Sequence, residues 1–121
     1  MNRTLRKIRD QLGPVNGLLV ATRDGLVLSS DTEGIEDANV AAMAATAIGL
    51  AIQFTAHADV GEARTALFEG CSGHVAVFPV ETGVLLVVLG EKDTNMGLFN
   101  IAAKQALSQL REVLEDTKTD E

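Results

Sequence analysis

Histidine, cysteine and paired carboxylates are the side chains of this sequence best suited to chemistry. Cys71 and His74 stand three residues apart, a workable spacing for a thiol nucleophile and its base, but no third group is placed to orient the histidine. His57 and His74 could begin a metal site, yet further ligands at metal-binding spacing are missing. Asp31 and Glu33 fall in a polar acidic segment, where a mobile solvated loop is expected. The sequence therefore predicts neither catalysis nor a bound metal.

Two arginines suit a different role, contact with a nucleotide held by another protein, because guanidinium matches phosphate geometry. Arg23 is expected in a turn and Arg64 on a strand, where simple exposure explains both equally well. The chain has no GxxxxGK[ST] motif, and no GxGxxG follows an expected strand. We therefore expect the chain itself to bind neither a nucleoside triphosphate nor another cofactor.

Composition narrows the protein class further. The 121 residues, 46% hydrophobic and 22% charged, fit one globular domain spanning 1–121, with an ordered core over about residues 3–115. Acidic residues outnumber basic ones by 17 to 10, and Trp and Tyr are absent, so nucleic-acid binding is not expected. The single cysteine allows no internal disulfide, and the first apolar stretch is too interrupted for a signal peptide. These features predict a cytoplasmic protein.

The charge is unevenly distributed along the chain. The first ten residues carry four basic side chains and one acidic one, whereas the rest of the chain carries six basic and sixteen acidic ones. A solvated helix face is the simplest interpretation of the basic start. Contact with a partner or a membrane surface is the alternative.

Hydrophobic spacing and turn residues predict the elements that must position these groups. The expected order is helix, strand, strand, helix, then three strands and a last helix. Val84–Leu89 is the most apolar strand and should lie at the centre of the sheet, while Pro79 should stand near a strand end or a bulge. Asp37 is expected to cap the middle helix, and Thr94 or Asn95 the last one. The expected bounds are about 5–12, 15–22, 26–30, 37–57, 63–69, 74–80, 84–89 and 95–114.

The middle helix has no charged residue over the 19 positions from Ala38 to Ala56. About 20 apolar residues can span a membrane. Here alanine dominates, polar residues dilute the hydrophobicity, and no basic cluster flanks either end, so a membrane span is not predicted. A helix that is apolar all round must instead be covered on more than one side.

Helical-wheel positions separate a bulky face of this helix from a small one. The bulky face is expected to pack on the sheet, and the small face to allow close approach of a second copy of the chain. The alternative is a monomer whose alanines only favour the helix. The bulky stripe is Val40, Met43, Ala47, Leu50 and Phe54; the small stripe is Ala38, Ala42, Ala45, Gly49 and Ala56, with Gln53 among them.

A resemblance to a known family rests on several of these segments. Residues 13–20, GPVNGLLV, followed by residues 24–30, DGLVLSS, resemble the opening hairpin of the roadblock (dynein light chain) family. The Ala-rich helix 38–56, the strand 62–69 and the helix start Asn95–Leu98 are similar to its small prokaryotic members. The likeness covers about residues 3–115, and its motifs are patterns of turn and burial rather than catalytic signatures.

The resemblance implies an α+β fold of the roadblock, profilin-like type. A five-stranded antiparallel sheet would carry the long middle helix on one face and the N- and C-terminal helices on the other. Family members dimerise through the middle helix and the third strand, which here are Ala38–Ala56 and Ala63–Phe68. The expected interface residues are Ala38, Ala42, Ala45, Gly49, Gln53, Arg64, Ala66 and Phe68.

The resemblance also implies a function, because roadblock proteins regulate or scaffold small Ras-like GTPases. Bacterial members act on gliding-motility GTPases, and eukaryotic members serve dynein or lysosomal scaffolds. The expected protein is a non-catalytic homodimer, or a tetramer, that modulates the nucleotide cycle of such a GTPase by positional contacts at Ile48, Ile52 and Arg23. No catalytic arginine is carried over. The alternatives are a structural adaptor without effect on GTP turnover and a small-ligand sensor module.

Overall fold

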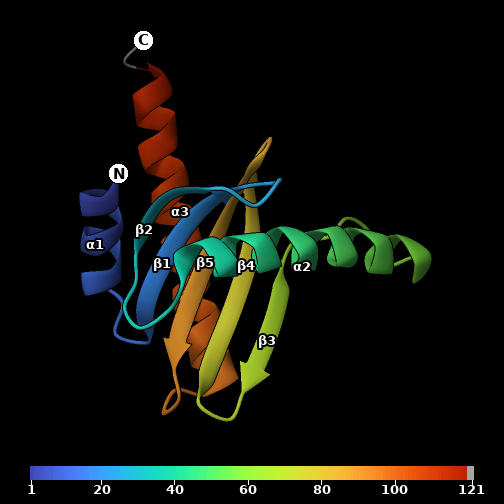
Figure 1. The fold of residues 1–121 in the computed structure, drawn as a ribbon, viewed down its shortest axis with the longest axis horizontal. Coiled ribbons are helices and arrows are strands. Elements are labelled where there is room, and N and C mark those ends of the chain that lie inside the picture. The colour runs from blue at the N-terminus through green and yellow to red at the C-terminus, as the bar shows by residue number, and fades with distance from the viewer. Residues whose placement is uncertain (120–121) are drawn as a thin grey trace.

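The computed structural model describes residues 1–119, which form a five-stranded antiparallel sheet with helices on both faces (Figure 1). The strands lie in the order β2-β1-β5-β4-β3. Both the predicted order of elements and the α+β class are confirmed, although the last helix runs beyond its expected end near Leu114. The elements are α1 (Asn2–Asp10), β1 (Val15–Thr22), β2 (Val27–Asp31), α2 (Asp37–His57), β3 (Ala66–Gly70), β4 (Gly73–Glu81), β5 (Val84–Glu91) and α3 (Met96–Thr119).

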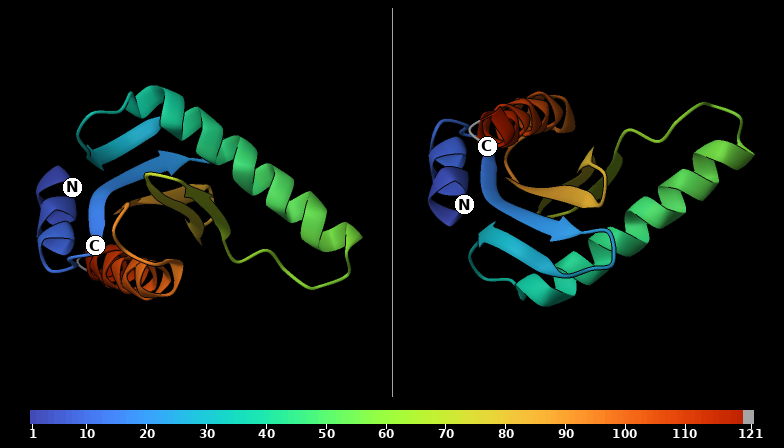
Figure 2. Two further views of the ribbon diagram at one scale, coloured as in Figure 1. Left: turned by 90° about the horizontal axis from the view of Figure 1, so that it is seen from below. Right: turned by 90° about the horizontal axis from the view of Figure 1, so that it is seen from above.

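The sheet separates two apolar cores. α1 and α3 cover one face, and α2 crosses the other (Figure 2). Leu5 and Ile8 of α1 pack with α3 against β1, β4 and β5, as their helical spacing predicted. Leu12 joins the same core but lies beyond the helix, which ends at Asp10 rather than at the expected residue 12. The expected placement of the helices on the two faces is confirmed.

The most apolar strand lies at the centre of the sheet, as the sequence predicted. β5 is the middle strand, and its residues Leu85–Val88 are buried. The expectation for Pro79 is also confirmed, because the pairing of β4 with β5 shifts register between Pro79 and Glu81. Proline cannot donate a backbone hydrogen bond, and an irregularity in the ladder accommodates that loss.

The two expected helix caps have different outcomes. Asn95 caps α3, since its side-chain oxygen accepts a hydrogen bond from the Leu98 backbone N–H at 2.8 Å. Asp37 does not cap α2: the N-cap is Glu36, without a side-chain cap bond, and Asp37 lies in the first turn. Its carboxylate instead accepts hydrogen bonds from the hydroxyls of Ser30 and Thr32, which hold the β2–α2 connection.

α2 contacts the sheet through a third face, which is distinct from the bulky and the small stripes defined from the sequence. Ala41, Ala44 and Ile48 are buried against the sheet, and Val40 of the bulky stripe packs at the margin of the same core, whereas Met43, Leu50 and Phe54 of that stripe are exposed. The expectation that this stripe packs on the sheet is therefore wrong. A helix that is apolar all round carries no periodic signal that tells its sheet-facing side from the others.

α2 is longer than the sheet is wide, and its C-terminal half continues past β3 (Figures 1 and 2). By length and composition it could cross a membrane. Its two ends, however, connect β2 and β3 of one sheet, and three of its residues belong to the core beneath it. The helix is thus a part of this fold whose outer surface lacks cover.

Candidate functional site

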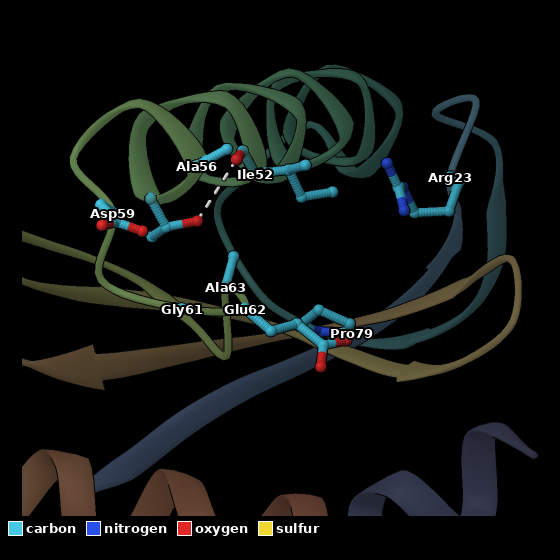
Figure 3. A pocket seen from close by; sticks show the side chains of 9 residues that line it. Arg23, Ile52, Ala56, Asp59, Gly61, Glu62, Ala63 and Pro79 are labelled. Carbon is cyan, nitrogen blue, oxygen red and sulfur yellow. Dashed lines mark hydrogen bonds between the residues drawn. The ribbon is translucent and has the colours of Figure 1, made fainter.

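Two of the three residues expected to contact a GTPase, Arg23 and Ile52, line one cleft (Figure 3). The cleft has a volume of about 490 Å³ and lies between the last turns of α2, the β1–β2 turn and the end of β4. Clefts of this size hold small ligands or a few side chains of a partner. The lining residues are Arg23, Ile52, Thr55, Ala56, Asp59, Gly61, Glu62, Ala63 and Pro79.

Local turn chemistry holds Arg23 at one rim of the cleft. Its backbone N–H donates to the carbonyl of Gly83 at 3.0 Å, which ties the β1–β2 turn to the β4–β5 turn. The Thr22 hydroxyl donates to the Asp24 carboxylate and accepts from the Leu26 N–H at 3.0 Å. Gly25 adopts φ +92°, a conformation that favours glycine. The backbone that carries Arg23 is therefore fixed before any partner arrives.

The end of α2 forms the opposite rim. The Val60 N–H donates to the Thr55 carbonyl at 3.1 Å, and the Asp59 N–H donates to the Ala56 carbonyl at 3.3 Å. This is the paired hydrogen bonding of a Schellman helix end. Asp59 occupies the left-handed position with φ 58°, where glycine is the usual residue. The helix end thus keeps an exposed carboxylate at the cleft.

The third expected GTPase-contact residue is not at this surface. Ile48 is 0% exposed and packs against the sheet on the same helix face as Ala41 and Ala44. Ile52, one helical turn later, is 39% exposed because α2 by then approaches the sheet edge. Ile48 is thus a core residue, and the expectation that it contacts a partner is wrong.

The bulky stripe of α2 is its most exposed part. Met43 is 71% exposed, Leu50 62% and Phe54 68%. Single exposed apolar residues are ordinary, but these three share one helix face over twelve residues. The stripe is therefore an apolar surface that a partner can cover.

The small-residue stripe flanks the sheet contact on the other side of α2. Ala38, Ala42 and Gln53 are exposed, and Ala45 and Gly49 are half-buried. Ala42 already has a neighbour within the chain, because a Cβ built on Gly25 would lie 3.2 Å from the Ala42 Cα. The turn before β2 therefore covers part of this flank.

The expected interface residues near β3 lie at the edge of the sheet. Ala66 is half-buried and Phe68 is 50% exposed; both belong to β3. Arg64 was expected within a strand, but β3 begins at Ala66, and Arg64 lies exposed before it. Among residues 1–119, β3 has a strand neighbour only on its β4 side.

A second concavity, a groove of about 910 Å³, lies below α2 at the other end of these strands. Its apolar lining includes Ile35, Phe68, Val75 and Leu89. Val75 and Leu89 are half-buried residues that pack at the margin of the core beneath α2. The helix therefore leaves part of this sheet face open.

The Roadblock/LC7 domain family matches residues 1–90 of the chain. The chain belongs to this family. The uncharacterized protein MJ0310 of Methanocaldococcus jannaschii is 34% identical over 98 residues, which are 80% of this chain and 85% of the relative. The family predicted from the hairpin, the Ala-rich helix and the last helix start is therefore confirmed.

Solved structures match the whole roadblock domain. Myxococcus xanthus MglB aligns with a TM-score of 0.79 at 19% identity, over 95% of this chain and 94% of MglB. Schizosaccharomyces pombe profilin aligns with a TM-score of 0.69 at 11% identity, over 93% of this chain and 97% of profilin. At these identities the likeness shows the fold, and it confirms the roadblock, profilin-like architecture.

In the roadblock domain, His74 and Cys71 contact other residues rather than each other. His74 is 6% exposed, stacks on Phe99 with ring centroids 5.1 Å apart, and has its Nε2 3.4 Å from a Glu69 carboxylate oxygen. Cys71 is exposed with its Sγ 3.8 Å from the Ser72 hydroxyl. Within the described residues, no group of three or more His, Cys, Asp or Glu side chains could hold a metal ion.

The acidic pair is not the mobile solvated loop that the sequence suggested. Asp31 ends β2, and its carboxylate lies 2.6 Å from the Arg9 guanidinium in a largely buried ion pair. Glu33 is exposed in the connection that follows. The two carboxylates therefore have different environments, and Asp31 serves to hold α1 on β2.

The acidic rim of the cleft was not predicted from the sequence. Asp59 and Glu62 were not singled out, although both follow the end of the long helix. The available signal was an aspartate at a helix end two residues before Gly61, where a turn needs a left-handed residue. The packing of this turn over Pro79 depends on the tertiary fold and leaves no local pattern.

Proposed function

We propose that this roadblock domain forms a homodimer that binds a small Ras-like GTPase and modulates its nucleotide cycle by positional contacts. The main support is the apolar stripe of α2, which stays exposed beside a β3 edge that is unpaired among residues 1–119, in a member of the Roadblock/LC7 family. The partner class follows from the family resemblance, since roadblock proteins regulate or scaffold Ras-like GTPases. The domain would catalyse no step itself.

The dimer would be two-fold symmetric, with β3 of each copy side by side. The half of α2 that continues past β3 would then lie over the sheet of the other copy (Figure 1). Leu50 and Phe54 of that half point away from the sheet and would contact α2 of the other copy, while Phe68 and Val75 of the groove beside β3 would lie beneath the helix. Each copy would thus cover the open apolar surface of the other.

The size of the exposed stripe supports a stable dimer. Burying a side chain such as Met43, Leu50 or Phe54 contributes on the order of 1.5–3 kcal/mol, and symmetry doubles the number of buried side chains. Lost rotational and translational freedom offsets part of this gain. The small-residue stripe, with Ala45 and Gly49, would border this interface rather than form its centre.

The GTPase would bind at the cleft of Arg23 and Ile52, where one charged and one apolar side chain face the same space. A regulator without catalytic groups changes a nucleotide cycle only if it binds one state of the GTPase more tightly than the other. The proposed mechanism is therefore preferential binding of one nucleotide state. A cytoplasmic location belongs to this proposal, because GTP is a cytoplasmic nucleotide.

The test uses the Ras-like GTPases of the same genome, each purified and loaded with GDP or a non-hydrolysable GTP analogue. Mixing with the roadblock domain should give a complex in light scattering that prefers one nucleotide state. GTP hydrolysis or nucleotide exchange should change when the domain is added. Binding without either change would favour a structural adaptor, and no binding in either state would contradict the proposal.

A further inference from the structure

The cleft of Arg23 and Ile52 is electrically bipolar, with a cation at one rim and carboxylates at the other. Arg23 stands at the β1–β2 turn, while Asp59 and Glu62 follow the end of α2 (Figure 3). The C-terminal end of a helix carries partial negative charge, which adds to the carboxylate at Asp59. The potential therefore changes sign along the cleft.

Between Arg23 and Asp59 the cleft is mainly apolar, although the Glu62 carboxylate is drawn beside Pro79 and Thr55 also lines it (Figure 3). Ile52 and Ala56 face it from α2, and Pro79 faces it from β4 (Figure 3). A volume of about 490 Å³ accommodates a few side chains rather than a protein surface. A short segment that projects from a partner matches this shape better than a flat face.

Both rims are held in place by the fold. The Arg23 backbone bonds to Gly83, and the Asp59 turn is closed by two backbone hydrogen bonds to the last turn of α2. Pre-organised backbone reduces the ordering cost of binding. A glycine would adopt the left-handed conformation at residue 59 with less steric strain. The aspartate is less favourable for this turn, but it places a carboxylate at the cleft.

We propose that the cleft binds a short segment of the GTPase that presents an acidic side chain to Arg23, an apolar side chain to Ile52 and Ala56, and a basic side chain to Asp59 and Glu62. The inference rests on the proposed function and adds the chemistry and direction of the bound segment. A segment that enters in the reverse direction places like charges together, so the cleft selects one orientation.

The test measures affinity for the Ras-like GTPase in the nucleotide state that binds the wild-type domain. Arg23→Glu should weaken binding by about tenfold or more, because it removes an attraction and adds a repulsion. Asp59→Asn with Glu62→Gln should weaken it by about three- to tenfold, and Asn keeps a side chain that tolerates the left-handed turn. Arg3→Glu is the matched control: it makes the same charge change on the exposed side of α1 and should leave the affinity within twofold.

Two further measurements locate the contact. Raising the salt concentration should weaken binding of the wild-type domain more than that of the Arg23→Glu variant, because salt screens exposed charge pairs. Arg23→Lys should keep most of the affinity and form a carbodiimide cross-link to an acidic residue of the GTPase. All variants should retain the wild-type dimer by light scattering, which separates docking from folding.

The outcomes distinguish the two proposals. If the wild-type domain binds the GTPase and the cleft variants bind as tightly as the Arg3→Glu control, the cleft inference is overturned while the proposed function stands. If the wild-type domain binds no Ras-like GTPase in either nucleotide state, the proposed function fails, and this inference fails with it.

Discussion

The two edge strands of the sheet, β2 and β3, differ in how far other residues of the chain cover them. The second half of β2 is covered, because the Asn2 side-chain oxygen accepts hydrogen bonds from the Ser30 N–H at 3.0 Å and from the Ser29 hydroxyl, while Val27 and Leu28 before it are 38% and 56% exposed. At the end of β2, Asp31 pairs with Arg9 of the same helix. Such cover prevents a strand edge from pairing with another chain.

β3 has no such protection among the described residues. It has a neighbouring strand on one side only, and its Leu67 and Phe68 are 38% and 50% exposed. An uncovered apolar edge is a site of association with another chain. Beside it, α2 extends past the sheet with its bulky stripe exposed. The contrast indicates that the fold blocks one edge and leaves the other for assembly.

The largest effect is expected from a charge placed in the α2 stripe. Leu50→Glu should raise the dimer dissociation constant by about 100-fold or more, roughly 2.7 kcal/mol, because an unpaired carboxylate would be buried in an apolar interface. Light scattering across a concentration series measures this change. Leu26→Glu is the matched control, since Leu26 is 63% exposed in the β1–β2 turn and Leu50 is 62% exposed. Equal dimerisation of the two variants would contradict an interface at the stripe.

The next effect comes from the β3 backbone. Gly70 and Gly73 pair across the two-residue turn between β3 and β4, so alternation along the strand directs the Leu67 N–H away from β4. Leu67→Pro removes that outward donor and should weaken the dimer about tenfold while the monomer stays folded.

The control for the backbone prediction is Leu28→Pro, which places a proline on the other edge strand, β2, at the register shift between the pairs Val20–Ser29 and Ala21–Val27. It should leave the dimer dissociation constant unchanged in sedimentation velocity, with folding checked by circular dichroism. If both proline variants dimerise as the wild-type domain does, β3 does not pair across the interface.

The sequence predicted much of the fold because local patterns specify it. Alternation and turn residues located the strands, and the continuous apolar run Val84–Leu89 identified the central one. Proline chemistry placed Pro79 at an irregularity of the ladder, and Asn95 is one of the two residues predicted to cap the last helix. In each case one residue type or a short run determines the local structure.

The site was harder to predict because its geometry depends on which face of α2 meets the sheet. That helix is apolar on every side, so the sequence assigned the bulky stripe to the core and Ile48 to the surface, whereas Ile48 is buried and the stripe is exposed at Met43, Leu50 and Phe54. Arg23 and Ile52 were predicted together, and they do line one cleft. Asp59 was missed because its place at the cleft depends on the direction in which α2 ends.

A smaller effect is expected from uncovering β2. Arg9→Met keeps the apolar stem but leaves Asp31, which is 15% exposed, with only the longer contact to Arg6 at 3.9 Å. The free energy of unfolding should fall by ~1–3 kcal/mol, measured by urea denaturation. Arg3→Met, on the exposed side of the same helix, should change stability by less than ~0.5 kcal/mol. If the covered edge prevents association, Arg9→Met should also form larger oligomers at high concentration.

The smallest effect on the dimer is expected from a substitution in the small-residue stripe of α2, and it distinguishes this stripe from the bulky one. Gly49 is half-buried, and a Cβ built on it meets nothing within 4 Å, so a side chain fits there in the monomer. Gly49→Lys should favour the helix by ~0.5–1 kcal/mol and weaken the dimer only a few-fold, because it lies on the border of the proposed interface. Gly49→Ala is the control, since it raises helix propensity without adding charge. If Gly49→Lys abolishes the dimer in light scattering while Leu50→Glu leaves it intact, the interface lies on the small-residue stripe instead. The order of the two effects therefore decides which flank of the helix meets the second copy.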